Sequence, residues 1–318
     1  MPYLTPIPAG VTFPATMTQT ELDKRFGTED ACRAYLAKLR WPDDKVHCPR
    51  CGLSLKVYTL KSKPWHWVCK HCNKNGYRFS LLTSTIFENT NVPLVLWFKV
   101  IYLMTVSKKG VSAMQVRRML DPVRGTKGSY RTAWYMCHRI RAAMQSEEFP
   151  LLTGVVEVDE TYIGGKNRFR HGGGRGMQAR TGKRSIPRDD KVPVIGAIAR
   201  KGNVVCQVIE RANAKTLGGF VTETVSPKVE LVATDQHTGY QYSFDRPHAS
   251  VNHHKGEYVR GVVHTQNLDS FWSLLKRGVV GTFHQVSKDY LPLYLAEFSF
   301  RHNHRENPDI FGAVCAGC

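Results

Sequence analysis

One apolar stretch with a carboxylate inside it, residues 154–165, constrains the fold of this chain more than any other feature. It reads Gly-Val-Val-Glu-Val-Asp-Glu-Thr-Tyr-Ile-Gly-Gly, and its β-branched valines predict a strand that the glycines end. Because an unpaired carboxylate is costly to bury, Asp159 on a central strand is expected to hold a cation. Asp159 would alternatively be a strand-end residue that caps a turn, and the strand pattern alone does not separate the two interpretations.

Two later acids are the expected companions of Asp159. Asp235 ends the apolar run that begins at Val229, and Asp269 opens a predicted helix over 267–278. We predict that the three aspartates converge on two Mg²⁺ ions, which Mn²⁺ would replace, because these cations take oxygen ligands. Lys276 lies two helical turns after Asp269 and so on nearly the same face, where it would hold a DNA phosphate. Asp269 also suits a helix start on capping grounds alone.

The chain carries a large positive charge, since 45 Lys and Arg against 26 Asp and Glu give +19, with a pI near 9.7. This charge favours a polyanion as partner, because neutralised phosphates release counterions. A membrane surface would also attract it, but the sequence shows no amphipathic basic helix and no signal peptide. The most apolar run, 92–106, contains Lys99 and is shorter than the ~20 residues of a membrane span. We therefore expect a buried helix there and no membrane partner.

Four of the nine cysteines form two C-x-x-C pairs, Cys48 with Cys51 and Cys69 with Cys72. Seventeen residues separate the pairs, a spacing typical of a zinc ribbon. Each pair aims two thiolates at one point, and four sulfurs close a tetrahedral shell around one structural Zn²⁺. Four unrelated buried cysteines or a redox pair would be the alternatives, and two pairs at ribbon spacing fit zinc better.

Helices are predicted around the ribbon, over 20–39 before it and over 93–106 after it. A shorter helix from Ala113 and a basic one over 130–144, which carries Arg139 and Arg141, resemble a helix-turn-helix. A plain helical hairpin would give the same pattern. The zinc ribbon beside it and the net charge favour contact with DNA, so both arginines are predicted DNA-binding residues.

From Gly154 the pattern changes to strands, at 154–163, 192–199, 204–209 and 229–233, with helices over 215–225, 267–278 and 291–303 and a short strand or extended entry at 262–263. The order matches a mixed α/β sheet with flanking helices, the ribonuclease-H-like plan. A glycine-rich basic insertion, 165–191, interrupts it and is too basic to pack as core. It is either a solvated loop or a segment that orders on a nucleic-acid backbone. Its predicted DNA-binding residues are Lys166, Arg168, Arg170, Arg175, Arg180, Lys183 and Arg184.

Several of these segments together resemble the DDE-type insertion-sequence transposases that have an N-terminal zinc ribbon and an ISXO-like catalytic domain. The matching segments are Cys-Arg-Ala-Tyr-Leu at 32–36, Arg-Trp-Pro at 40–42, Cys-Pro-Arg-Cys-Gly at 48–52, Val-Asp-Glu-Thr-Tyr-Ile-Gly-Gly at 158–165, His-Thr-Gln-Asn at 264–267, Ser-Phe-Trp-Ser-Leu-Leu-Lys-Arg at 270–277, Gly-Thr-Phe-His at 281–284, Glu-Phe at 297–298 and Phe-Arg-His-Asn at 300–303. The resemblance implies a ribonuclease-H-like catalytic domain that cleaves transposon ends and joins 3′-hydroxyls to target DNA. It implies Asp159, Asp235 and a third residue as the catalytic set.

The third catalytic residue departs from the family's pattern. The family commonly has Glu there, or Asn or His in some groups, whereas this chain has Asp269, which is one methylene shorter. Asn267 would alternatively supply the third ligand, as in the groups that use Asn. The resemblance therefore leaves Asp269 and Asn267 as alternatives.

The predicted domains are an N-terminal helical segment (1–45), a zinc ribbon (46–90), a helical DNA-binding region (91–150) and a catalytic domain (151–318). The expected partners are double-stranded DNA, as transposon ends and target, and further copies of the chain in a homodimer or larger oligomer on DNA. The expected location is the bacterial cytoplasm, at the nucleoid. A host nuclease or recombinase on the same fold, or an inactive zinc-ribbon DNA-binding regulator, would be the alternatives.

Overall fold

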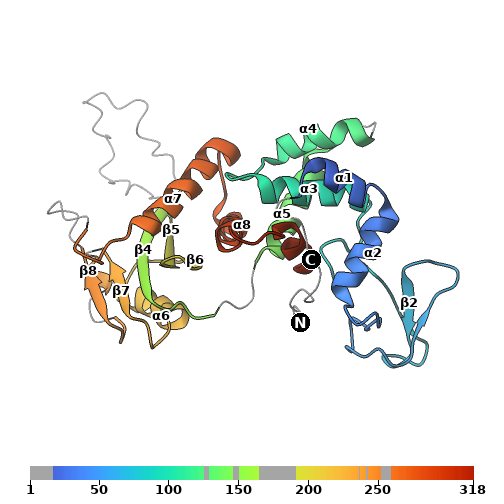
Figure 1. Cartoon of the computed structure of the whole chain (residues 1–318), viewed down its shortest axis with the longest axis horizontal. Helices are drawn as coiled ribbons and strands as arrows, with labels where there is room; N and C mark the ends of the chain where they lie inside the picture. Colours follow the sequence, from blue (N-terminus) through green and yellow to red (C-terminus); the bar gives the residue numbers. More distant parts are fainter. Residues whose placement is uncertain are drawn as a thin grey trace, which may run out of the picture. The chain divides into compact units, whose positions relative to one another are not determined.

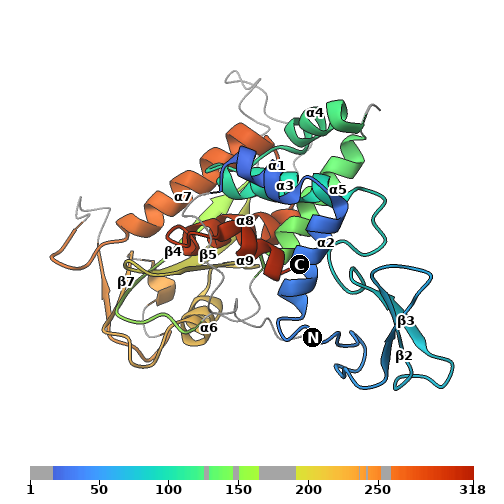
Figure 2. The same cartoon turned by 45° about the vertical axis from the view of Figure 1, so that its right-hand side comes forward.

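The computed structural model describes residues 17–124, 129–145, 150–164, 191–235, 237–240, 243–251 and 259–318, without the side chains of 121–124. The chain divides into two compact units. One unit comprises Met1–Glu148 with Ala296–Cys318, and the other comprises Phe149–Leu295. Figures 1 and 2 show the helices and strands of both from two directions. Each unit has an apolar core of its own.

Helices dominate the first unit. Their bounds are α1 Gln19–Phe26, α2 Glu29–Arg40, α3 Leu94–Val106, α4 Ala113–Arg124, α5 Tyr130–Ala143, the end of α8 Leu291–Asn303, and α9 Ile310–Ala316. Thr18 and Thr28 cap α1 and α2 through their side chains. The predicted helices at 20–39 and 291–303 are thus confirmed, the first as two pieces separated near Gly27.

The apolar run before residue 106 forms α3, and the prediction of a buried helix is confirmed. Trp97, Phe98 and Met104 have no exposed surface. The ring of Phe98 lies 5.0 Å from that of Phe26 and 5.5 Å from that of Phe311. Among the described residues, no helix is long and apolar enough to span a membrane.

The C-terminal helix α9 belongs to this first core. Phe311 and Val314 are buried in it, and α9 packs against α2 and α3. The predicted catalytic domain ran to residue 318, whereas the second compact unit ends at Leu295. The physical reason is the apolar face of α9, which buries its side chains among the helices that precede the sheet.

Helices α4 and α5 pack together, as expected for either a helix-turn-helix or a plain helical hairpin. However, α5 is mainly a core helix, since Met136, Cys137 and Ile140 are buried. Arg141 is also buried, and its Nε lies 2.6 Å from an oxygen of the buried Glu297. The prediction that Arg141 binds DNA is therefore wrong, because its charge is satisfied inside the protein.

The zinc ribbon is a three-stranded antiparallel sheet of β1 Val57–Thr59, β2 His66–Cys69 and β3 Tyr77–Ser80. The first two strands lie between the cysteine pairs, up to Cys69, and the third lies beyond the second pair. Trp67 lies at its centre, with its ring 5.0 Å from that of Trp41 and 5.9 Å from that of Phe79. Because the sheet is so small, its stability is expected to depend strongly on the cysteine cluster.

The second unit contains a five-stranded mixed sheet in the order β6-β5-β4-β7-β8 within the described residues. The strands are β4 Val155–Ile163, β5 Val192–Ala199, β6 Val204–Val208, β7 Leu231–Thr234 and β8 His248–Ser250, and the helices are α6 Ala214–Thr224 and α7 Gln266–Gly278. Three antiparallel strands followed by two parallel ones, with helices on the sheet, confirm the ribonuclease-H-like plan. Residues 262–263, expected as a short strand or an extended entry, form no strand of the sheet: Val263 makes only an isolated bridge with Arg260, and β8 takes the edge of the sheet.

The two faces of the sheet carry different helices, as Figure 1 shows. Successive side chains of a strand point to opposite faces. Val156 and Val158 of β4 join a core with Leu217 and Phe220 of α6. The alternate residues of β4 face α7, since Asp159 accepts a hydrogen bond from Trp272.

Candidate functional site

The parallel pairing of β4 with β7 brings two of the predicted acids together. Val156 pairs with Val232 and Glu157 with Ala233, and the same register carried two residues further puts Asp159 beside Asp235. Both acids stand at the carboxyl end of their strand pairing. One carboxylate oxygen from each, with one from Glu160, lies in a group whose members are all within 4.8 Å of one another. This cluster of three carboxylates is the acidic centre of the unit.

Glu160 is the member of the acidic centre that sequence analysis missed. Its Oε2 accepts a hydrogen bond of 2.7 Å from the hydroxyl of Tyr240, and its Oε1 lies 3.7 Å from Nε2 of His237. Alternation along β4 would send Glu160 to the face opposite Asp159, and the adjacent Asp-Glu pair alone does not show that it reaches Asp235. The segment 237–240, which supplies both partners, draws the carboxylate toward the acidic centre.

The environment of Asp159 disfavours its charge and therefore fits a cation. Burial, together with the negative charges of Asp235, Glu160 and Asp269, raises the pKa of Asp159 to about 8. Burial also raises the pKa of Glu160. A divalent cation between these oxygens would offset both the burial and the mutual repulsion. The donor set, carboxylates only, suits Mg²⁺ or Mn²⁺.

A tryptophan from α7 fixes the orientation of Asp159. Nε1 of Trp272 donates a hydrogen bond of 3.0 Å to Oδ2 of Asp159. The indole lies over Gly196, the β5 residue paired with Asp159. A Cβ at position 196 would lie 2.7 Å from two ring atoms of Trp272, so only glycine leaves room for the ring.

The expected result of filling this space is a loss of stability. Gly196→Ala should lower the free energy of unfolding by about 1–3 kcal/mol, because the indole or the strand must move. Thermal unfolding measures this loss. Gly219→Ala on α6 is the matched control, since an added Cβ there meets no described atom within 4 Å and alanine favours a helix. Equal stability of the Gly196→Ala and wild-type proteins would contradict the packing argument.

Asp159 should also destabilise the metal-free protein in a pH-dependent way. Its pKa is raised from an ordinary 3.8 to about 8, so the folded state binds the proton more tightly than the unfolded state. Stability contributed by this proton is present below pH ~4 and is lost progressively as the pH rises to about 8. Without added Mg²⁺ or Mn²⁺, Asp159→Asn should raise Tm by several degrees at pH 8.5 and much less at pH 5. The exposed Glu230→Gln is the control, and an equal Tm difference at both pH values would contradict the assignment.

A pocket of about 430 Å³ opens between β4 and α7 beside the acidic centre. Its lining residues are Asp159, Glu160, Thr161, Asp269, Trp272, Ser273, Lys276 and Arg277. The structure therefore places Asp269 and Lys276 where the helical spacing predicted, on the face of α7 that looks toward Asp159. Arg277 adds a second cation, which sequence analysis did not single out. A pocket lined by carboxylates from both β4 and α7 and by cations from α7 suits a phosphate with bound metal ions.

Asn267 occupies a different position from Asp269. It lies outside the residues that line the pocket. Its Nδ2 donates a hydrogen bond of 2.7 Å to the buried Glu157, and its backbone N–H donates another of 2.9 Å to the same carboxylate. Asp269 instead is exposed and accepts a hydrogen bond of 3.3 Å from the hydroxyl of Thr265. Of the two alternatives for a third ligand, Asp269 is the one that faces the acidic centre.

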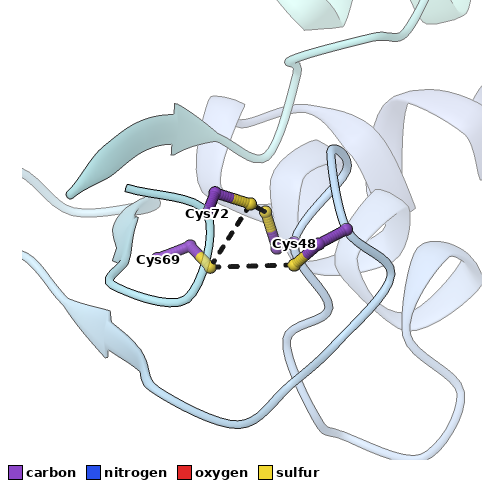
Figure 3. A group of neighbouring side chains, drawn as sticks. Cys48, Cys69 and Cys72 are labelled. Atoms are coloured by element: carbon purple, nitrogen blue, oxygen red, sulfur yellow. Dashed lines mark hydrogen bonds between the residues drawn. The ribbon is translucent and has the colours of Figure 1, made fainter. Parts of the chain in front are cut away.

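The four ribbon cysteines form the other candidate metal site. The Sγ–Sγ distances are 3.6 Å for Cys48 and Cys72, 3.8 Å for Cys51 and Cys69, and 3.8 Å for Cys69 and Cys72. Four sulfurs at about 2.3 Å from a tetrahedral zinc ion would lie about 3.8 Å apart. Figure 3 shows the side chains of Cys48, Cys69 and Cys72 turned toward one another. The donor set and spacing fit one structural Zn²⁺.

The predicted DNA contacts fall in two groups. The basic insertion lies outside the described residues, except for Lys191 at its end. Arg139 is half-buried, and its guanidinium donates to the carbonyl of Thr85 at 3.1 Å and also bonds the hydroxyl of Tyr135. It therefore fastens the segment between the ribbon and α3 to α5, and a DNA contact by Arg139 stays a prediction.

Comparison with known proteins gives two family matches and one relative. Residues 151–303 match the ISXO2-like transposase domain, and residues 27–75 match the transposase zinc-ribbon domain. The chain is 31% identical over 288 residues to a protein of Halobacterium salinarum described as an uncharacterized protein in transposable element ISH50. That alignment covers 87% of this chain and 92% of the relative, so it includes both the ribbon and the acidic centre.

Proposed function

The chain belongs to the insertion-sequence transposases that combine a transposase zinc ribbon with an ISXO2-like catalytic domain, and we propose that it cleaves DNA at transposon ends and joins the freed 3′-hydroxyls to target DNA by two-metal phosphoryl transfer. The observation that carries this proposal is the acidic centre, where oxygens of Asp159, Glu160 and Asp235 lie within 4.8 Å of one another. Carboxylates gathered this closely hold divalent cations in phosphoryl-transfer sites.

Each residue of the site has a role in this proposal. Asp159 and Asp235, with Glu160, would hold the cations, and Asp269 would complete the ligand set from across the pocket. Bound there, two divalent ions would activate the attacking water or 3′-hydroxyl and stabilise the leaving oxygen. Trp272 keeps Oδ2 of Asp159 in a fixed orientation through its hydrogen bond. Lys276 and Arg277 line the same pocket and would bind the phosphates beside the scissile bond.

Double-stranded DNA is the proposed substrate and partner. The net charge of +19 supports backbone binding, and the basic insertion follows β4 directly, so it begins close to the acidic centre in sequence. The zinc ribbon with the helices of the first unit would bind the transposon ends. A homodimer or larger oligomer on DNA would let one assembly act on both ends of an element.

Strand transfer with the purified full-length protein tests this function. The substrate is a labelled duplex that carries the inverted repeat flanking the gene, incubated with a supercoiled plasmid and Mg²⁺ or Mn²⁺. The expected products are a nick with a free 3′-hydroxyl at the repeat boundary and label joined to the plasmid. Nicks without joined product would indicate a nuclease on the same fold. Binding without any nick in either metal would indicate an inactive DNA-binding protein, and both outcomes would reject the transfer reaction.

A further inference from the structure

A buried carboxylate two residues before Asp159 has no part in the acidic centre. Glu157 has no exposed surface and lies on the face of β4 that carries Asp159. A charged group inside a protein must be compensated by donors or by opposite charge. The partners of Glu157 come from two places, the segment that leads into α7 and Arg200 at the end of β5.

The first turn of α7 donates to Glu157. Oε2 accepts from the backbone N–H groups of Asn267 and Leu268, at 2.9 and 3.2 Å, and Oε1 accepts from Nδ2 of Asn267 at 2.7 Å. Helix-terminal N–H groups have no partner within their own helix. Thr265 is the N-cap residue, and within the described chain its side chain caps none of these N–H groups. A strand residue distant in sequence thus caps α7, and its charge also suits the helix dipole.

Arg200 joins the same carboxylate to the preceding loop. Its Nε lies 3.0 Å from Oε1 of Glu157, and its guanidinium donates to the carbonyls of Val262 at 2.7 Å and His264 at 3.4 Å. Nδ1 of His264 lies 3.3 Å from the same Oε1. We call Glu157, Arg200, His264 and Asn267 the Glu157 anchor. It fastens both the loop and the helix start to β4.

The anchor determines where α7 begins relative to the acidic centre. Asp269 follows Asn267 by two residues in the same first turn, and Asp159 follows Glu157 by two residues on the same strand face. From this geometry we propose that Glu157 is a positioning residue, which fixes Asp269 opposite Asp159, and that Asn267 acts as a donor to Glu157 and not as a cation ligand. The consequence for catalysis rests on the function proposed above, whereas the anchor itself is a property of the metal-free protein.

Glu157→Gln is the first variant, because Arg200, Asn267 and Leu268 all donate hydrogen bonds to the two carboxylate oxygens. An amide would turn its NH₂ group toward donors at one of the two positions. Hydrogen exchange followed by mass spectrometry on the metal-free protein should show at least ~10-fold faster exchange in peptides covering 266–270. Peptides from α6 should be unchanged. Lys201→Ala is the matched control, since it removes one charge next to Arg200 from an exposed position.

Variants of Asn267 separate its two possible roles, donor to Glu157 and cation ligand. The two roles predict opposite rankings of Asn267→Asp and Asn267→Ala in nicking. If Asn267 is a donor to Glu157, Asn267→Asp sets a second carboxylate against the first. Hydrogen exchange at 266–270 should then be faster, and nicking slower, in Asn267→Asp than in Asn267→Ala. As a cation ligand, Asn267→Asp would nick at least as well as the wild type, and only Asn267→Ala would lose activity. The second order would overturn the proposal.

Nicking assays then connect the anchor to Asp269. Glu157→Gln should reduce nicking about 10- to 100-fold in Mg²⁺, with a smaller loss in Mn²⁺, since Mg²⁺ demands stricter ligand geometry. In an Asp269→Asn background, adding Glu157→Gln should reduce the nicking rate little further, because the carboxylate that Glu157 positions is already gone. Additive losses in the double variant, or unchanged exchange at 266–270, would overturn the inference. A wild-type protein that never nicks, with faster exchange in Glu157→Gln, would instead reject the proposed function and leave the anchor in place.

Discussion

Asp159→Asn and Asp235→Asn are each expected to remove metal-dependent nicking while leaving DNA binding intact. A neutral amide is a poor ligand for Mg²⁺, so the cations that offset the charge developing on the phosphate would be lost. A loss of about 4 kcal/mol of transition-state stabilisation corresponds to a rate reduction of about 10³-fold. The measurement is nicking of a labelled end duplex in Mg²⁺ or Mn²⁺, with gel-shift binding in parallel.

The control for this loss removes a charge nearby without entering the site. Glu230→Gln lies at an exposed position just before β7 and changes the net charge by the same amount. It should nick at the wild-type rate. The nicking rate of Glu160→Gln should lie between those of the aspartate variants and Glu230→Gln, because the Glu160 carboxylate joins the acidic centre but is also held by Tyr240. Full nicking by Asp159→Asn would reject the two-metal assignment of this site, even for a chain that belongs to a transposase family.

Removal of zinc should unfold the ribbon and leave the helical core of the first unit folded. The free energy of zinc binding to such cysteine sites is about 10–16 kcal/mol, far more than a three-stranded sheet of this size supplies from its own core. Elemental analysis of natively purified protein should give one tightly bound zinc per chain. After chelation, protease should cut within 46–80, while α3 and α5 stay protected because their side chains are buried among themselves.

Cysteine variants make the zinc prediction specific. Cys72→Ser should lose zinc and expose the ribbon to protease in the same way as chelation. Cys206→Ser is the matched control, since Cys206 lies on β6 in the other unit and should leave the zinc content unchanged. Retention of a full equivalent of zinc by Cys72→Ser would show that the four sulfurs do not form the site.

Local patterns in the sequence were sufficient to predict most helices and strands, the zinc ligands, and some of the charged residues that line the pocket. Ligand spacing alone predicted the zinc ribbon, because two C-x-x-C pairs at this separation can bring four sulfurs to one point. Apolar periodicity predicted the elements from β4 to α8 within a few residues, apart from β8. Asp159 and Asp235 were predicted to converge because each lies in or at the end of an apolar strand, and the observed register of β4 and β7 puts them side by side. Helical spacing likewise brought Asp269 and Lys276 to one face of α7.

Contacts between distant segments decided the rest. The sequence does not show that Arg141 meets Glu297 inside the first unit, since an arginine on a predicted basic helix has the same local pattern whether buried or exposed. Glu160 enters the acidic centre only because Tyr240 and His237 lie beside it. Asn267 turns to Glu157, 110 residues away in the chain, rather than to the metal site. Each of these outcomes depends on which partner a side chain meets after folding, and spacing along the chain carries no information about that partner.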